Sequence, residues 1–227
     1  MKILAFDCAG AQCAAAVVID GETTTEARVD SERGHAQLLM PMLVELAARA
    51  RVRLRDFDRF AVTTGPGSFT GIRVALAAAR GLAIGTDRPV IGVTNFEAVA
   101  AHAVAAPIPA PRLLVAIESR RAECFVQLFD RAGRPFAAPA MLAPENVAVW
   151  AGPGALAVAG DAGEVGARAG GVLAADADAG ELDGGLDAHD LDVVHDAAEE
   201  AAELGLGAVE ARVVAFVEGE LGDGAGV

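Results

Sequence analysis

The sequence predicts an α/β protein that contains two copies of one unit, each a mixed sheet flanked by helices. A short apolar strand ends in an acid twice, with Ile3–Phe6 before Asp7 and Leu113–Ile117 before Glu118. After each acid come a second strand and a turn, and then alternating helices and strands. A meander followed by helix–strand alternation, occurring twice, indicates a duplicated domain.

The individual elements follow from apolar runs and the turn signals between them. Asp20-Gly21 is a strong hairpin signal, and the run 130–133 is its counterpart in the second copy. In the first copy we expect strands at 3–6, 14–19, 23–29, 60–64 and 90–94, and helices at about 32–51, 70–85 and 95–104. In the second copy we expect strands at 113–117, 124–129 and near 155–159, and helices at about 144–150, 190–205 and 207–219. The Pro/Ala stretch 105–111 predicts the boundary between an N-terminal domain, 1–104, and a C-terminal domain, 105–227.

The charge of the chain argues against a protein that holds nucleic acid by itself. Hydrophobic residues make up 53% of the chain, and its formal net charge is −14. Residues 1–159 carry 16 basic and 15 acidic side chains, whereas residues 160–227 carry 2 and 17. RNA and DNA affinity depends on neutralising phosphates, which this balance does not favour. The acidic end is interpreted as a solvated surface.

Cysteine usage and hydropathy predict a cytoplasmic protein without a membrane partner. Cys8, Cys13 and Cys124 form no C-x-x-C pair and are odd in number. We therefore expect buried thiols in a reducing compartment, with neither a disulfide framework nor a zinc site. The apolar start of the chain is interrupted at Asp7, and no uncharged apolar run is long enough to span a membrane.

The segment Gly65–Arg73 joins a predicted strand to a predicted helix and reads Gly-Pro-Gly-Ser-Phe-Thr-Gly-Ile-Arg. Its backbone N–H groups can cradle an anion, or its glycines can make a tight strand-to-helix turn. We favour the turn, because glycine-rich matches alone are weak and no lysine is present to reach a phosphate. Arg73 opposes the helix dipole, so we expect it to have an acid, a carbonyl or an anion as partner.

Asp7 and Glu118 are the candidate carboxylates of a nucleotide cleft, ready to hold a magnesium-bound nucleotide or a water. The loop after Asp7 lacks hydroxyl and basic side chains, and the loop after Glu118 lacks paired glycines. A working ATP site and a vestigial cleft both stay open, and we favour a vestigial cleft that includes Ser68 and Arg73. No two histidines have the H-x-x-x-H spacing, and Ser68 is not in a G-x-S-x-G elbow, so neither a metal site nor hydrolase chemistry is indicated.

The helix that contains His35 is apolar on nearly all sides. The stripe that a surface helix would direct to its core consists of Leu39, Met42, Leu43 and Leu46. The side chains that point to other faces are Leu38, Met40 and Val44. Such a helix is buried on two sides, and we favour a partner over its own core as the second cover. Pro41 predicts a kink or a delayed helix start. In the following helix, Gly81 predicts close packing on the sheet or on a neighbouring helix.

These segments, in this order, resemble the bacterial TsaB (YeaZ) family. The matching pieces are Ile3–Asp7, His35 with Leu38, Leu39 and Pro41, Gly65–Arg73, Gly81–Ala83, Pro89–Val93 and Ala116–Arg120. The resemblance covers roughly residues 1–130. The duplicated unit also resembles the actin-like (ASKHA, RNase H-like) superfold. The chain departs from the family in its lack of tyrosine and in an atypical acidic end from about residue 175.

The resemblance implies a non-catalytic pseudo-enzyme without a cofactor of its own. Relatives support TsaD, a metal- and nucleotide-using paralogue that transfers a threonylcarbamoyl group to a tRNA adenosine. It also implies a TsaE-type ATPase as a further partner, contact with tRNA only through the complex, and a helical heterodimer interface that can form a homodimer. The expected interface residues are His35, Leu38, Leu39, Met42, Leu43 and Leu46. The alternatives are an ATP-binding small-molecule kinase or ATPase that uses Asp7 and Glu118 and, third, a protease-like hydrolase.

Overall fold

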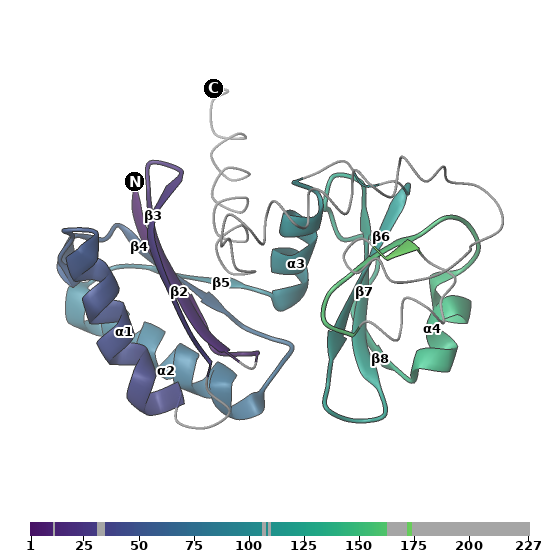
Figure 1. Ribbon diagram of the computed structural model, residues 1–227, viewed down its shortest axis with the longest axis horizontal. Helices are drawn as coiled ribbons and strands as arrows, with labels where there is room; N and C mark the ends of the chain where they lie inside the picture. Colours follow the sequence, from purple (N-terminus) through teal and green to yellow (C-terminus); the bar gives the residue numbers. More distant parts are fainter. Residues whose placement is uncertain (11, 31–34, 106–107, 109, 163–171, 174–227) are drawn as a thin grey trace. The chain divides into compact units, whose positions relative to one another are not determined.

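The computed structural model describes residues 1–10, 12–30, 35–105, 108, 110–162 and 172–173, and these residues fall into two compact units (Figure 1). Unit 1 contains Met1–Ala98 and unit 2 begins at Val99. The domain limits expected from the sequence, 1–104 and 105–227, stay a prediction. The helices expected at 190–205 and 207–219 lie outside the described residues.

Unit 1 is a mixed five-stranded sheet in the order β3-β2-β1-β4-β5. Its strands are β1 (Lys2–Asp7), β2 (Gln12–Ile19), β3 (Glu22–Asp30), β4 (Arg59–Thr63) and β5 (Val90–Val93). The first three form an antiparallel meander, and β4 and β5 run parallel to β1. The carboxyl ends of β1, β4 and β5 therefore lie together at one end of the sheet.

Helices α1 (His35–Arg49) and α2 (Phe69–Thr86) pack together on one face of this sheet (Figure 1). Alternation along β1 directs Leu4 and Phe6 to the core beneath these helices and Ile3 and Ala5 to the opposite face. The stripe of α1 enters the same core through Leu39, Met42, Leu43 and Leu46. Each fully buried leucine contributes about 2 kcal/mol, so this packing holds both helices to the sheet.

Unit 2 repeats the topology of unit 1. Its strands are β6 (Arg112–Glu118), β7 (Cys124–Asp130), β8 (Ala140–Leu142), β9 (Ala157–Ala159) and β10 (Val172–Leu173), in the order β10-β9-β6-β7-β8. The meander β6-β7-β8 is antiparallel, and β9 and β10 run parallel to β6. Helix α4 (Pro144–Ala151) packs on this sheet. The predicted fold class, a duplicated α/β unit with mixed sheets flanked by helices, is confirmed.

Two local features differ from what the sequence indicated. Pro41 lies inside α1, which begins at His35, so of the two alternatives for Pro41 the delayed start is wrong and the kink stays a prediction. The short edge strand β8 was not expected, because its three residues carry no alternation that a sequence can show. Among the described residues, no helix is both long and apolar enough to cross a membrane.

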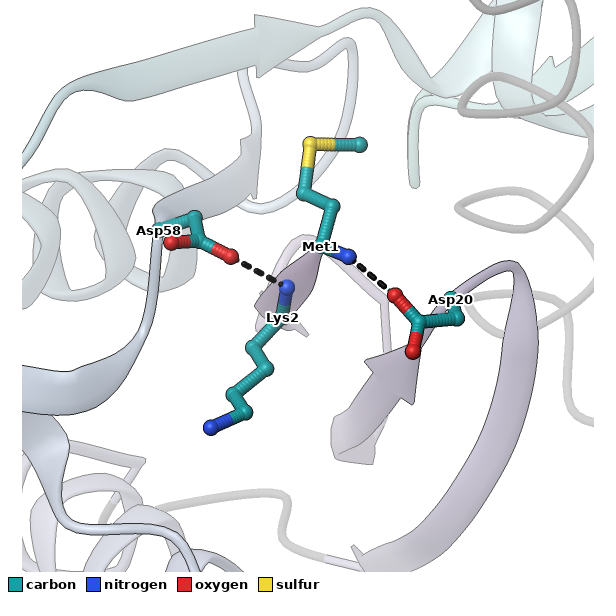
Figure 2. Close-up of polar contacts among 4 residues, drawn as sticks. All are labelled: Met1, Lys2, Asp20 and Asp58. Atoms are coloured by element: carbon teal, nitrogen blue, oxygen red, sulfur yellow. Dashed lines mark hydrogen bonds and ion pairs between the residues drawn. The ribbon is translucent and has the colours of Figure 1, made fainter.

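Two polar contacts hold the start of β1 (Figure 2). The amino group of Met1 bonds to the carboxylate of Asp20 in the β2–β3 turn. The Lys2 N–H donates to Asp58 Oδ2 at 2.7 Å, just before β4. The candidate site lies at the other end of the sheet, where β1 and β4 end.

Candidate functional site

Asp7 is a buried link between the ends of two parallel strands. It is the last residue of β1 and only 7% exposed. Its Oδ1 accepts the Ala9 N–H at 2.8 Å and the hydroxyl of Thr63, the last residue of β4. Both donors are buried, so this carboxylate oxygen is engaged in holding the loop after β1 and the end of β4 together.

The segment Gly65–Arg73 makes the strand-to-helix turn that the sequence favours. Ser68 caps α2, and its Oγ accepts the Gly71 N–H at 3.3 Å. The Ser68 N–H donates to the Ala9 carbonyl at 2.7 Å. The Gly65 N–H donates to Asn95 Oδ1 at 3.1 Å. These three N–H groups, which an anion cradle would need, therefore already have partners within the chain.

Glycine at two positions of this segment lets backbone touch backbone. A Cβ added to Gly71 would lie 1.7 Å from the Cys8 carbonyl oxygen, and one added to Gly67 would lie 2.5 Å from the Ala9 carbonyl oxygen. Cys8 and Ala9 are themselves buried. The first turn of α2 thus fills the space beside the loop after β1, where the phosphates of a nucleotide would need open N–H groups. The N–H groups of Ala9, Ser68 and Gly71 are therefore engaged within the chain rather than open to a phosphate.

The matching place in unit 2 is built differently. Glu118, the last residue of β6, is exposed, whereas Asp7 is buried. The Glu118 N–H donates to Asp161 Oδ1 at 2.7 Å. A Cβ on Gly160, directly after β9, would lie 2.0 Å from the Ala116 carbonyl oxygen. The pairing of Asp7 with Glu118 across one cleft stays a prediction, because the two residues belong to different units.

Arg73 has an aromatic partner among the described residues, and the acid, carbonyl or anion expected from the sequence stays a prediction. Its guanidinium lies 5.1 Å from the ring centroid of Phe69, one turn earlier on α2. Phe69 is 73% exposed, so the pair stands at the surface. A cation–π contact of this exposure contributes about 0.5–1 kcal/mol and offsets the unfavourable helix dipole.

Most of the interface residues expected on α1 lie in the core of unit 1 instead. The buried ones are Leu39, Met42, Leu43 and Leu46, none of them more than 7% exposed. The exposed apolar side chains of this helix are Leu38, Met40 and Val44. Of the expected set, Leu38 alone is exposed among the residues whose side chains are described; the His35 side chain is outside them. The interface itself stays a prediction, and its surface residues are the ones outside the core stripe.

Helix α2 also has exposed small residues. Ala77, Gly81 and Gly85 recur every four residues and are exposed, with Ile84 among them. Added Cβ atoms at Gly81 and Gly85 would meet nothing within 4 Å. The expectation that Gly81 packs on the sheet or on a neighbouring helix of the chain is therefore wrong. We use the name α1–α2 outer face for the exposed apolar and small residues of the two adjacent helices taken together: Leu38, Met40, Val44, Ala77, Gly81, Ile84 and Gly85. On α1, Met40 and Val44 are one turn apart, whereas Leu38 lies on the other side of the core stripe. The four-residue spacing of small residues was a signal for this face that the sequence interpretation missed.

Within the residues that the structure describes, no three His, Cys, Asp or Glu side chains gather as a metal site requires. The exposed apolar and small residues of α1 and α2 form a surface of the kind that suits contact with another molecule.

Comparison with known proteins gives a consistent set of relatives. A family model described as "TsaD: tRNA N6-adenosine threonylcarbamoyltransferase" matches residues 29–168. The chain is 34% identical over 131 residues to the tRNA threonylcarbamoyladenosine biosynthesis protein TsaB of Escherichia coli (strain K12), a match that covers 58% of this chain and 56% of that protein. It is 35% identical over 125 residues to the TsaB of Haemophilus influenzae, covering 55% and 52%. The matched region thus spans about half the length of these curated relatives.

A solved structure extends the likeness to nearly the whole chain. YeaZ from Pseudomonas aeruginosa superimposes with a TM-score of 0.66 at 31% identity, covering 94% of this chain and 97% of that one.

Proposed function

The chain belongs to the TsaB (YeaZ) family, and we propose that it acts in the biosynthesis of N6-threonylcarbamoyladenosine in tRNA as a non-catalytic subunit that binds and supports a TsaD-type transferase. The pathway is that of its relatives, whose names describe tRNA threonylcarbamoyladenosine biosynthesis. The observation that carries the scaffold role is the α1–α2 outer face, which is apolar, helical and exposed.

The closed loop at the end of β1 supports the non-catalytic part of the proposal. A nucleotide-dependent enzyme of this fold class would use backbone N–H groups at the strand end to hold phosphates. Here the Ala9 and Ser68 N–H groups bond within the chain, and the first turn of α2 abuts the Cys8 carbonyl. Asp7 is then a structural residue that joins β1 to β4, and no reaction step is assigned to it.

The α1–α2 outer face supports the partner-binding part. Exposed Leu38, Met40 and Val44 supply apolar area, and methionine adapts its shape to a partner. The small residues Ala77, Gly81 and Gly85 recur every four positions along α2. Such spacing lets a second helix approach closely, as it does at helix–helix contacts. A helical partner, either the TsaD-type subunit or a second copy of this chain, fits such a face. A TsaE-type ATPase and tRNA would then join through the assembled complex in the cytoplasm.

The test is co-purification of the full chain with the TsaD-type protein of the same cell, followed by tRNA modification with and without the chain. Val44→Asp places a carboxylate on the α1–α2 outer face without touching the core stripe. Burying it in an interface costs at least about 2 kcal/mol, so we expect a loss of about 30-fold or more in affinity. Val149→Asp is the matched control, because Val149 is 84% exposed on α4 of unit 2. Wild-type binding by both Val44→Asp and Leu38→Asp would contradict this interface.

The alternative is an ATP-binding small-molecule kinase or ATPase. The fold class favours it, since the acid after the first strand of each unit is where such enzymes hold nucleotide-bound magnesium. Saturable ATP binding or turnover by the isolated chain, lost both in Asp7→Ala and in a folded Asp7→Asn variant that keeps the hydrogen-bond acceptor but not the charge, would establish this alternative and remove the scaffold proposal.

A further inference from the structure

Two cysteines face each other at the closed end of the candidate site. The antiparallel register of β1 and β2 pairs Phe6 with Ala15 and Asp7 with Ala14. One step further, the same register places Cys8 opposite Cys13. Neither residue has any exposed surface, and both belong to the core beneath α1 and α2.

The two thiols are hydrogen-bonded to each other. This bond, followed by burial, raises the pKa of Cys8, and the same bond lowers the pKa of Cys13. A lowered pKa favours the thiolate of Cys13, and the thiolate is the reactive form in disulfide exchange.

The backbone needs no large movement to bring the sulfurs together. Directly opposite residues of an antiparallel pair have Cα atoms about 4.5–5.5 Å apart. Disulfides span Cα separations of about 4.4–6.8 Å. Cys124, by contrast, lies in unit 2 and is buried against its own sheet.

We propose that Cys8 and Cys13 form a reversible thiol–disulfide pair that is oxidised by a small-molecule disulfide such as oxidised glutathione. The Cys13 thiolate attacks the glutathione disulfide, whose S–S bond breaks and releases one glutathione thiolate. Cys8 then gives up its proton and attacks the mixed disulfide at the Cys13 sulfur, which releases the second glutathione. The two protein thiols are oxidised to one disulfide, and one glutathione disulfide is reduced to two thiols.

The position of the pair links its oxidation state to the start of α2. The Cys8 carbonyl abuts Gly71, and the neighbouring Ala9 carbonyl accepts the Ser68 N–H. A disulfide would tie together the two ends of the turn that holds this helix start. The proposal does not depend on the proposed function, because it concerns chemistry within unit 1 alone.

The experiment uses the folded, fully reduced chain incubated with oxidised glutathione, then denatured in acid, alkylated and mapped by mass spectrometry. Incubation continues until amide hydrogen exchange across residues 8–13 is complete, so that access to the buried thiols is not the limit. All three cysteines of the chain are free at the start. We expect loss of two alkylatable thiols, a Cys8–Cys13 linked peptide, an alkylated Cys124, and full reversal by dithiothreitol.

Two variants sharpen the outcome. Cys124→Ser should form the same linked peptide as the wild type, whereas Cys8→Ser should form no disulfide within the chain. The proposal is overturned if all three thiols of the wild type are still alkylated after the complete incubation, or if the disulfide that forms contains Cys124.

Discussion

Gly71→Ala is the sharpest perturbation of the closed loop, because the added methyl group has no space. Its Cβ would lie 1.7 Å from the carbonyl oxygen of Cys8, a buried residue directly after β1. Ordinary carbon–oxygen contacts are about 3.3 Å or longer. The start of α2 must therefore withdraw from β1 by roughly 1.5 Å.

The cost of this withdrawal follows from the contacts that it breaks. The Ser68 N–H loses the Ala9 carbonyl, now 2.7 Å away, which costs about 1–3 kcal/mol for a group that stays partly buried. Displacing a packed helix end adds about 1–3 kcal/mol. The helical preference of alanine over glycine returns only about 0.5–1 kcal/mol. We expect a net loss of about 3 kcal/mol in the free energy of unfolding, a large part of the usual total.

The assay is urea unfolding followed by far-ultraviolet circular dichroism. Fluorescence is unsuitable, because the single tryptophan, Trp150, lies on α4 of unit 2. Gly81→Ala is the matched control on the same helix, since nothing lies within 4 Å of its added Cβ. This control should stabilise the chain by about 0.5–1 kcal/mol, opposite in sign to Gly71→Ala. Equal unfolding midpoints for the wild type and Gly71→Ala would refute the close contact and, with it, the argument that the loop is closed to phosphates.

Two further predictions concern buried polar links. Asp7→Ala leaves the hydroxyl of Thr63 and the Ala9 N–H without their acceptor. Thermal unfolding should show a loss of about 2–4 kcal/mol in the free energy of unfolding, most of it restored by Asp7→Asn. An unchanged free energy of unfolding in Asp7→Ala would show that the carboxylate is not a structural link. Arg112→Ala removes donors to four carbonyls at the end of α4, at 2.5–3.4 Å. The free energy of unfolding of unit 2, followed by Trp150 fluorescence, should fall by about 1.5–3 kcal/mol. An unchanged value would show that water replaces the guanidinium.

The strands and the long helices could be predicted because each has a local signal. Apolar runs bounded by acids or turn residues predicted β1, β4 and β6, and the Asp20-Gly21 turn signal predicted the hairpin of β2 and β3. The edge strand β8 has three residues and no such signal. Residues 174–227 carry two of the expected helices, and those predictions lie outside the described part of the chain.

The site was harder to predict, because its decisive contacts join segments far apart in the sequence. Gly71 and Gly81 look alike as glycines in one helix, yet one abuts a carbonyl and the other faces open space. Only the position of α2 relative to the loop after β1 separates them. On α1 the 3.6-residue period did separate the core stripe, including Leu43, from Val44 on the outside. The sequence interpretation assigned the stripe itself to the partner surface, whereas its side chains are buried within unit 1.

In both units a glycine lies against a backbone carbonyl at the end of the central strand, and this bears on what the fold is used for. In a sheet of this kind ligands bind beyond the carboxyl ends of parallel strands. In unit 1 a glycine after β4, Gly67, lies against the Ala9 carbonyl; in unit 2 a glycine after β9, Gly160, lies against the Ala116 carbonyl. In each unit, backbone therefore occupies the space at the end of the central strand. A side chain at either glycine would push the two backbone segments apart. The α1–α2 outer face is the surface of unit 1 that we propose for recognition of another molecule. Under that proposal, variants of Val44 test the function more directly than variants of Asp7.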